Sequence, residues 1–217
     1  PDHYTAAYRA YAAYVLAKQA KITLGPLRDI AEKDMLAAVG KLPGVHLGVA
    51  MLLTGNESEG NALILQALMA ERGDHYLGDY GSEIRDQAMV INILISTDAV
   101  NKELQQQALN MLPKLADLIQ QKQWLSTQER SAILALAMTI EQQYQQQAWQ
   151  GTLTIADEQS VLQKTGEYRQ NIDPLAQVKR SFINSGTIPL YVSFDWMGVK
   201  KQAEYDLNNG IEVNTEH

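Results

Sequence analysis

The sequence predicts a mainly α-helical fold, part of an α/α toroid of helical hairpins, followed by a small antiparallel β-domain. Apolar residues recur at spacings of three and four from Tyr4 to Ala148, as on one face of a helix. After Trp149 the pattern changes to the alternation that is typical of strands. We therefore expect a partial helical toroid over residues 1–148 and a β-rich segment over residues 149–217.

A stripe of tyrosines marks the first predicted helix. Tyr4, Tyr8 and Tyr11 lie three or four residues apart, and Tyr14 continues the series. Aromatic residues at this spacing are typical of a core-facing helix whose hydroxyl groups lie at the rim. The alternative is an exposed face that binds a partner, but at this spacing we expect the stripe to belong to the core.

Three shorter helices are predicted next. The second helix runs from Gly25-Pro26 to about Val39, since proline suits the first turn, where its missing N–H is not needed. The third helix covers 43–53 and the fourth covers 57–69. Both are apolar around most of their circumference, so we expect them to be buried on more than one side.

Two N-terminal caps define the later helices. Ser82 is the predicted N-cap of a helix over 82–96. Ser126-Thr127-Gln128-Glu129 forms a capping box at the start of the last helix. Between them we predict a long amphipathic helix over 101–123, bent at Pro113 because proline removes a backbone hydrogen bond.

Short connections join these helices into hairpins that alternate long amphipathic helices with short apolar ones. Such hairpins form either a solenoid or a closed α/α toroid. The sequence shows no strict repeat of the ankyrin or tetratricopeptide kind, which favours the toroid.

The β-rich segment shows alternating apolar residues in three places. The predicted strands are 149–155, 178–184 and 190–196. The last two are expected to form a hairpin, and the polar stretch over 166–173 is expected to be either a long loop or a mobile edge. A further strand is predicted to begin at 211–213.

Composition argues against several classes of function. The net charge of −7 speaks against a nucleic-acid partner, since phosphate binding needs clustered lysine and arginine. The chain has no cysteine, so it contains no disulfide, thiolate metal ligand or cysteine nucleophile. No apolar run approaches the ~18 residues of a membrane span. The chain begins at Pro1 without a leader-like segment, and we expect it to be part of a longer protein.

The most informative motif spans the end of the loop before the helix over 82–96 and the first turn of that helix. Tyr80, Gly81 and Ser82, followed by Arg85 and Asp86, resemble the aromatic-Gly-Ser and Arg-Asp signature in the helical thioester domain of bacterial alpha-2-macroglobulins. Other segments resemble the same family in the same order along the chain: 8–18, 46–56, 125–130, 149–157, 186–192 and 210–213. The resemblance therefore spans nearly the whole chain, with residues 149–217 similar to a CUB-like segment that leads into the next macroglobulin domain.

The resemblance implies a role in a large protease trap of the bacterial periplasm or cell envelope, whose parent chain can be lipid-anchored. Its implied partners are target proteases and neighbouring macroglobulin domains, without direct membrane contact from this segment. In the family, a Cys-x-x-Gln motif upstream of the matched helices forms a thioester that attacks the trapped protease, although some bacterial members lack it. The resemblance thus implies a structural segment with no catalytic residues, no cofactor and no metal.

Two other functions stay open at this point. Asp74, Asp79, Glu83 and Asp86 could serve an α/α-toroid glycoside hydrolase, which needs two carboxylates ~5–10 Å apart. Clefts of that kind are rich in tryptophan and tyrosine, whereas Trp124 is the only tryptophan in the helical region. A generic helical interaction scaffold is the second alternative.

The remaining candidates are interpreted as structural. Arg85 and Asp86 could form a binding surface, but an Arg-Asp pair at a helix start more often ties the helix to the adjoining loop, which is what we expect here. His46 and His75 are isolated in the sequence, so we expect packing histidines with satisfied ring nitrogens rather than metal ligands or bases.

Overall fold

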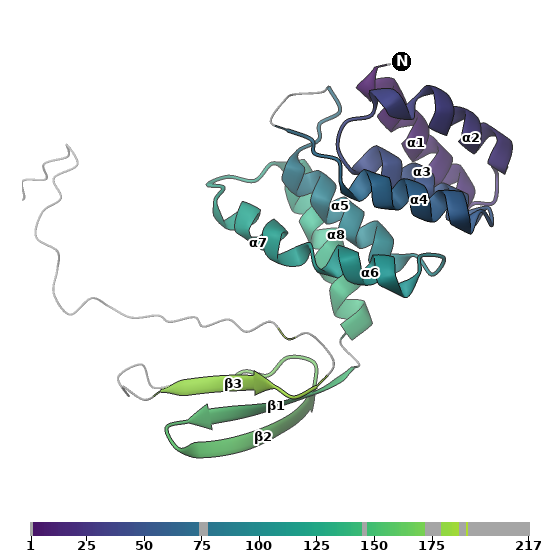
Figure 1. Ribbon diagram of the computed structural model, residues 1–217. Coiled ribbons are helices and arrows are strands. Elements are labelled where there is room, and N and C mark those ends of the chain that lie inside the picture. Colours follow the sequence, from purple (N-terminus) through teal and green to yellow (C-terminus); the bar gives the residue numbers. More distant parts are fainter. Residues whose placement is uncertain (1, 74–77, 145–146, 172–178, 187–189, 191–217) are drawn as a thin grey trace, which may run out of the picture. The chain divides into compact units, whose positions relative to one another are not determined.

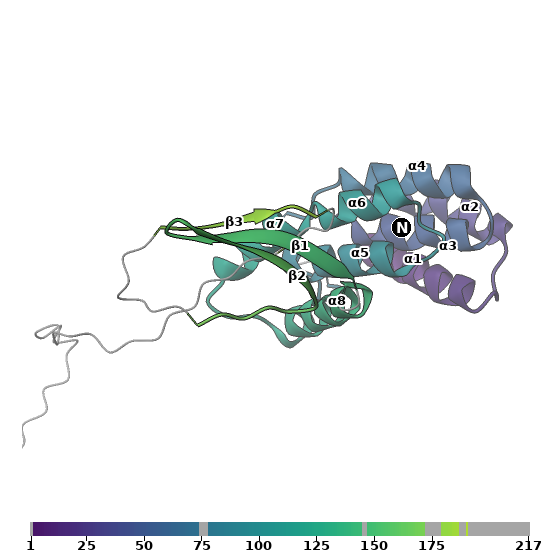
Figure 2. The same ribbon diagram turned by 90° about the horizontal axis from the view of Figure 1, so that it is seen from below.

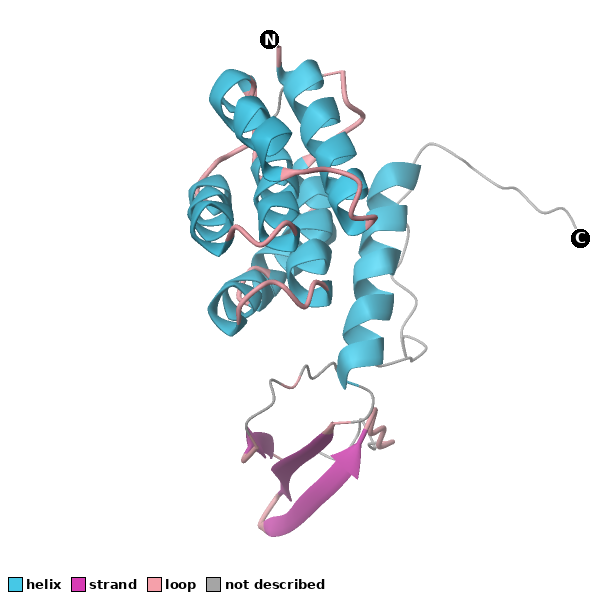
Figure 3. Ribbon diagram, turned by 90° about the vertical axis from the view of Figure 1, so that its right-hand side faces the viewer, coloured by secondary structure: helices cyan, strands magenta, loops and turns pink. Residues whose placement is uncertain are grey.

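The computed structural model describes residues 2–73, 78–144, 147–171, 179–186 and 190 (Figure 1). The chain divides into two compact units, Pro1–Tyr144 and Gln145–His217. The described part of the first unit is helical, and that of the second contains a three-stranded antiparallel sheet (Figure 3). The predicted class, mainly helical with a small antiparallel sheet, is confirmed.

The first unit is built from pairs of helices joined by short connections. Its α-helices are α1 (His3–Lys18), α2 (Leu24–Lys33), α3 (Leu42–Leu53), α4 (Glu57–Leu68), α5 (Glu83–Ser96), α6 (Lys102–Leu109), α7 (Leu112–Gln120) and α8 (Thr127–Tyr144). A short 3₁₀ turn, η1 (Met35–Ala37), follows α2, so the second predicted helix ends earlier than expected. None of the described helices combines the length and the apolar character needed to cross a bilayer.

Helices α3 and α5 contribute many of the buried residues of the core. Every residue of α3 from Leu42 to Leu52 is buried, and α3 packs between α1 and α4 (Figures 1 and 2). The contact with α4 is close because glycines face each other there. A Cβ on Gly48 would lie 2.6 Å from Cγ1 of Ile64 and 2.9 Å from the carbonyl oxygen of Gly60. Helix α5 packs against α6, α7 and α8 through its apolar side chains.

The prediction that the tyrosines of α1 are buried is wrong for Tyr4, Tyr8 and Tyr11, whereas Tyr14 is partly buried and packs against the core. The buried stripe of α1 consists of Ala6, Ala10, Ala13 and Ala17, whereas the side chain of Tyr8 is 65% exposed. Tyr4 and Tyr11 are exposed as well. Alanine lets α1 approach α3 closely, and a tyrosine stripe at that contact would hold the two helices apart.

Two other helical predictions need correction. The single bent helix predicted over 101–123 is two helices, α6 and α7, because Pro113 stands in the first turn of α7 and starts a new helix there. Helix α4 is not buried on more than one side. Only Gly60, Ile64 and Ala67 are buried in it, and its remaining apolar residues are partly or fully accessible to solvent.

The second unit forms a sheet with the order β2-β1-β3. The strands are β1 (Ala148–Ile155), β2 (Glu158–Thr165) and β3 (Arg180–Asn184). Strands β1 and β3 agree with the prediction, but β2 was missed because its sequence is polar and almost wholly exposed. The strands predicted over 190–196 and from 211 lie outside the described residues, apart from Leu190.

Candidate functional site

The first turns of four helices meet at one end of the helical unit. At this end, His3 of α1 accepts a hydrogen bond from the backbone N–H of Val39, just before α3, and contacts Asp79, just before α5. Ser82, the N-cap of α5, donates a hydrogen bond from its hydroxyl to Glu129 of α8 at 2.7 Å. Helices α1, α3, α5 and α8 therefore start side by side, and the predicted motif lies at their shared end.

The motif residues shape the entry into α5. Ser82 accepts a hydrogen bond from the backbone N–H of Arg85 at 3.2 Å, which confirms it as the N-cap. Tyr80 has a φ of +54° and a side chain that is 75% exposed, so it projects from the turn instead of packing beneath it. The motif thus directs the chain abruptly into the helix and leaves one aromatic ring at the surface.

A buried arginine, Arg72, holds the loop and the helix together. Its side chain is 3% exposed, and its Nη1 donates to Oδ2 of Asp86 at 2.6 Å and to Oδ2 of Asp79 at 3.0 Å. Nη2 pairs with Oδ1 of Asp79, whose Oδ2 lies 3.1 Å from Nε2 of His3. Arg85 adds a bond from Nη1 to Oδ1 of Asp86 at 3.0 Å. We call these five residues the Arg72 cluster.

Gly81 is required by this cluster. A Cβ at position 81 would lie 2.4 Å from Nη1, 2.5 Å from Cζ and 2.6 Å from Nη2 of Arg72. Any side chain there would displace the guanidinium. The glycine of the motif therefore makes room for an arginine that lies nine positions earlier in the chain.

The two aspartates that share Arg72 respond to it differently. Burial opposes ionisation of Asp79, but hydrogen bonds from Arg72, His3 and the Gly81 N–H outweigh it and hold the pKa of Asp79 well below its usual range. Asp86 is more deeply buried, and burial raises the pKa of Asp86 above its ordinary value despite Arg72 and Arg85. Asp79 is thus firmly ionised, whereas Asp86 depends on its arginines to carry a charge.

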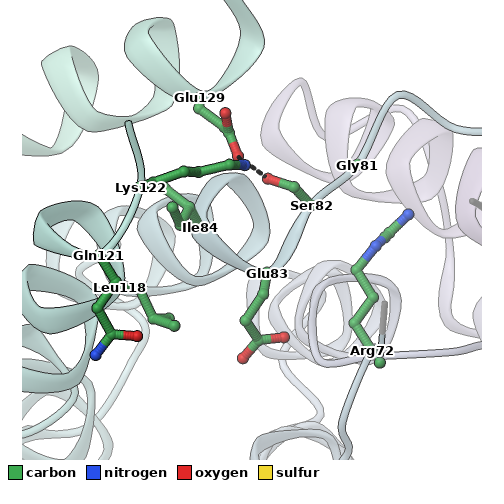
Figure 4. Close-up of a pocket in the computed structure, with 10 residues that line it drawn as sticks. Arg72, Gly81, Ser82, Glu83, Ile84, Leu118, Gln121, Lys122 and Glu129 are labelled. Atoms are coloured by element: carbon green, nitrogen blue, oxygen red, sulfur yellow. Dashed lines mark hydrogen bonds and ion pairs between the residues drawn. The ribbon is translucent and has the colours of Figure 1, made fainter. Parts of the chain in front are cut away.

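A second polar cluster lies around Glu129. The predicted capping box is confirmed, with the Ser126 N–H donating to Glu129 at 2.7 Å and the Glu129 N–H donating to the Ser126 hydroxyl at 3.2 Å. Nζ of Lys122 also donates to the carboxylate, at 2.5 Å. Burial works against this charge, but the hydrogen bonds from Lys122, Ser82 and Ser126 lower the pKa of Glu129 to about 2. Figure 4 shows Glu129, Lys122 and Ser82 at the wall of a cavity of about 420 Å³ between the two clusters.

A third feature is a tyrosine-lined cavity of about 400 Å³ next to the Arg72 cluster. Its lining includes Tyr4, Tyr8 and Tyr11 of α1, Tyr80, His46 of α3, and Arg85 and Met89 of α5. His46 is buried, stacks on Tyr14 with ring centroids 5.2 Å apart and meets the ring of Tyr11 edge-on at 5.3 Å. It is a packing histidine as predicted. The expectation that its ring nitrogens are satisfied is wrong, because its Nε2 has no hydrogen-bond partner in the described part of the chain.

Three of the four carboxylates considered for a glycoside hydrolase are engaged in ion pairs. Asp79 and Asp86 are bound to Arg72, and Glu83 lies 3.8 Å from Nζ of Lys114. Asp74 and His75 lie outside the described residues. Within the described ranges no group of three or more histidine, cysteine, aspartate or glutamate side chains could hold a metal ion.

The sequence alone identified the motif residues at the start of α5 but not the buried arginine that binds them. It singled out Tyr80, Gly81, Ser82, Arg85 and Asp86, and the structure brings all five to the start of α5. It missed Arg72, a lone arginine beyond the end of α4, and His3. The only signal for Arg72 was indirect: two aspartates close to an apolar helix need a buried cation.

The sequence of the chain is similar to those of known proteins. No protein-family model matches the chain. It is 36% identical to the alpha-2-macroglobulin of Escherichia coli (strain K12) over 210 residues, 95% of this chain and 12% of that protein. It is 32% identical to the alpha-2-macroglobulin of Xylella fastidiosa (strain 9a5c) over 206 residues, 91% of this chain and again 12% of the relative. The chain thus spans a small part of the length of these curated relatives.

Solved structures show the same relationship. Trypsin-activated alpha-2-macroglobulin from Escherichia coli matches 82% of this chain, and 11% of its own, with a TM-score of 0.60 at 32% identity. Salmonella alpha-2-macroglobulin reacted with methylamine matches 85% of this chain, and 12% of its own, with a TM-score of 0.59 at 32% identity. The chain therefore belongs to the bacterial alpha-2-macroglobulin family, as a homologue of one segment of those longer proteins.

Proposed function

We propose that this chain is a structural segment of a bacterial alpha-2-macroglobulin-type protease trap, a broad-spectrum endopeptidase inhibitor of the periplasm or cell envelope. The observation that carries the proposal is the 36% identity to such a protein over 95% of the chain. In this proposal residues 1–148 belong to the thioester-type helical domain and residues 149–217 to the CUB-like segment. Its partners are target proteases, met through the full-length protein, and neighbouring macroglobulin domains.

The polar clusters support a scaffolding role. Arg72, Asp79, Asp86 and Glu129 form hydrogen bonds and ion pairs that join the first turns of α1, α5 and α8. A general acid or base must be free to exchange protons with a substrate, and these carboxylates are held by arginine, lysine and N–H donors. We infer that they keep one end of the helical unit rigid and that this segment has no catalysis of its own.

The covalent chemistry of the family would come from elsewhere in the protein. A thioester needs a cysteine, and the 217 residues contain none. We propose that this segment helps to enclose the reactive group, where the parent has one, and transmits the change that follows cleavage by a protease. The trypsin-activated state solved for the Escherichia coli relative is consistent with such a change.

The proposal is tested by incubating the chain with trypsin or with elastase. The chain alone should not slow the cleavage of a protein substrate, and mass spectrometry should detect no covalent adduct with the protease. Inhibition or an adduct from this chain would overturn the assignment of roles. Hydrolysis of a polysaccharide that is abolished by Asp79→Asn or Glu83→Gln would instead establish the glycoside hydrolase.

A further inference from the structure

The buried ring of His3 is bound through both of its nitrogens. Its Nδ1 lies 3.0 Å from the backbone nitrogen of Val39, and its Nε2 lies 3.1 Å from Oδ2 of Asp79. A backbone N–H can only donate, so Nδ1 carries no proton and accepts this bond. The proton of the neutral ring is therefore on Nε2, which donates it to the carboxylate of Asp79. These two bonds fix the tautomer of His3 and join the start of α1 to Val39 and to the loop before α5.

A second proton on this ring would break one of the two bonds. Protonated Nδ1 is a donor and would face the Val39 N–H, so neither group could serve the other as an acceptor. A buried N–H that loses its acceptor costs free energy, so the backbone at Val39 would have to move toward another acceptor or toward water. Nε2 is a donor in both states of the ring. The bond to Asp79 is therefore kept when the bond to Val39 is lost.

The charges around His3 hold a protonated ring on the side of the loop. Asp79 is ionised and faces Nε2, so it attracts the imidazolium. Arg72, which binds the same carboxylate, and the N-terminal end of α1 both add positive potential that limits this attraction. The other charged groups on the neighbouring elements have partners of their own: Asp2 binds the N–H of Thr5, Arg9 binds Asp34, Lys41 binds the carbonyl oxygen of Ala70, and Arg85 binds Asp86. Asp74 and His75 lie outside the described residues.

We propose that His3 is an acid-sensitive latch between α1 and the backbone that enters α3. The neutral ring binds Val39, and uptake of a proton from solvent at Nδ1 releases Val39 while the bond to Asp79 stays. The released backbone borders the Arg72 cluster, because a Cβ added at Gly40 would lie 3.3 Å from Cβ of Arg72. Acid would therefore loosen the entry to α3 at the point where it packs on Arg72. The inference does not depend on the role in a protease trap, because it rests on the residues of the helical unit alone.

The test follows His3 and Val39 by NMR in the whole ¹⁵N-labelled chain from about pH 8 to about pH 5, the range over which histidine side chains gain a proton. At the upper end, long-range ¹H–¹⁵N spectra of the ring should show a protonated Nε2 and an unprotonated Nδ1. As Nδ1 takes up its proton, the protection factor of the Val39 amide against hydrogen exchange should fall about fivefold to tenfold with the same midpoint, because one hydrogen bond is lost. The Ser126 N–H is the internal control. It also donates to a side chain, but the pKa of its acceptor Glu129 is lowered to about 2, so its protection should not change.

Two variants separate this ring from the other titrating groups. His3→Gln supplies an amide that can accept and donate but does not titrate, so the protection of Val39 should stay constant over the same pH range. His75→Gln is the matched control. It removes a histidine that lies four positions before Asp79 in the sequence, and Val39 should respond to acid in this variant as it does in wild type.

Other results would overturn the latch. A ring that carries its proton on Nδ1 at about pH 8, or that stays neutral down to about pH 5, would contradict the tautomer or the switch. Protection of Val39 that does not change with pH, or that falls equally in His3→Gln, would show that His3 does not hold this backbone. A response that disappears in His75→Gln would assign the switch to His75. The ring spectra and the wild-type profile need no variant, so they decide the proposal even where His3→Gln fails to fold.

Discussion

Replacing Arg72 by methionine is the most informative perturbation of this fold. Methionine keeps most of the buried volume and removes the cation that binds Asp79 and Asp86. The side chains of Asp86 and Asp79 are only 6% and 14% exposed, so water cannot replace the guanidinium fully. Removing one partner of a buried ion pair typically costs about 3–5 kcal/mol. Because Asp86 keeps its bond from Arg85, we expect Arg72→Met to lower the free energy of unfolding by an amount near the lower end of this range.

The loss should depend on pH in a defined direction. In the wild-type protein the pKa of Asp79 is depressed, so its contribution to stability is present above the pKa of unfolded aspartate, near 4, and is lost on acidification. Without Arg72 both carboxylates are buried with less compensation, and their pKa values should rise above the unfolded value. Protonation of the two carboxylates then removes the cost of burying their charges, so the variant loses less stability relative to wild type as the pH falls. The difference in unfolding free energy between wild type and variant should therefore shrink from pH 7.5 to pH 4.5, by at most ~1.4 kcal/mol per pH unit for each proton taken up.

Urea denaturation followed by helical circular dichroism measures this directly. The matched control is Arg28→Met, because Arg28 makes a two-pronged ion pair with Glu59 on the exposed surface. Exposed pairs contribute little, so this variant should unfold close to wild type at both pH values. Arg85→Ala should fall between the two variants, since its side chain is 20% exposed and Asp86 keeps Arg72. If Arg72→Met lost no more stability than Arg28→Met, or lost the same amount at both pH values, the reasoning about the buried cluster would be refuted.

Three other outcomes follow from the structure. Gly81→Ala should destabilise the helical unit by about 1–3 kcal/mol in urea titrations, since the new Cβ meets the Arg72 guanidinium, and a neutral effect would show that the loop can shift without cost. Glu129→Gln should lose stability at pH 7 and approach wild type near pH 3, because the pKa of Glu129 is lowered to about 2 and its contribution fades below pH 4.5; parallel pH profiles for the two proteins would contradict this. Limited trypsin digestion should cut first after Arg169, whose side chain is 84% exposed in a stretch without regular structure, and an earlier cut within α1 to α8 would count against the stability of the helical unit.

Local signals predicted much of this fold. Ser82 and the capping box at Ser126 fixed the starts of α5 and α8, because a cap is satisfied by atoms three residues away. Alternation over Trp149 to Ile155 identified β1 for the same reason, since a strand with one partly buried face repeats every two residues. Strand β2 has no such face. Its pairing with β1 depends on backbone hydrogen bonds, which do not require particular side chains and so cannot be recognised from composition.

Features that depend on distant partners could not be predicted. The stripe of tyrosines on α1 is indistinguishable by spacing from a core stripe, and only the presence of α3 makes Ala6 and Ala10 the buried face. Arg72 gains its role from Asp86, fourteen positions later, through the turn at Gly81. Long-range pairing of this kind is decided by tertiary packing, and it produces no periodic pattern in a single sequence.

A chimera tests the central claim, that this chain is a structural segment of a protease trap, most directly. This chain would replace the matching segment of the Escherichia coli alpha-2-macroglobulin, to which it is 36% identical over 210 residues. The measured quantity is the rate at which trypsin cleaves a large protein substrate in the presence of the chimera, with its thermal unfolding midpoint as the check on folding. The account predicts that the chimera slows cleavage as the parent does and that Arg72→Met within it lowers both the midpoint and the inhibition. A chimera that unfolds at the parent's midpoint and yet leaves trypsin fully active would contradict the account.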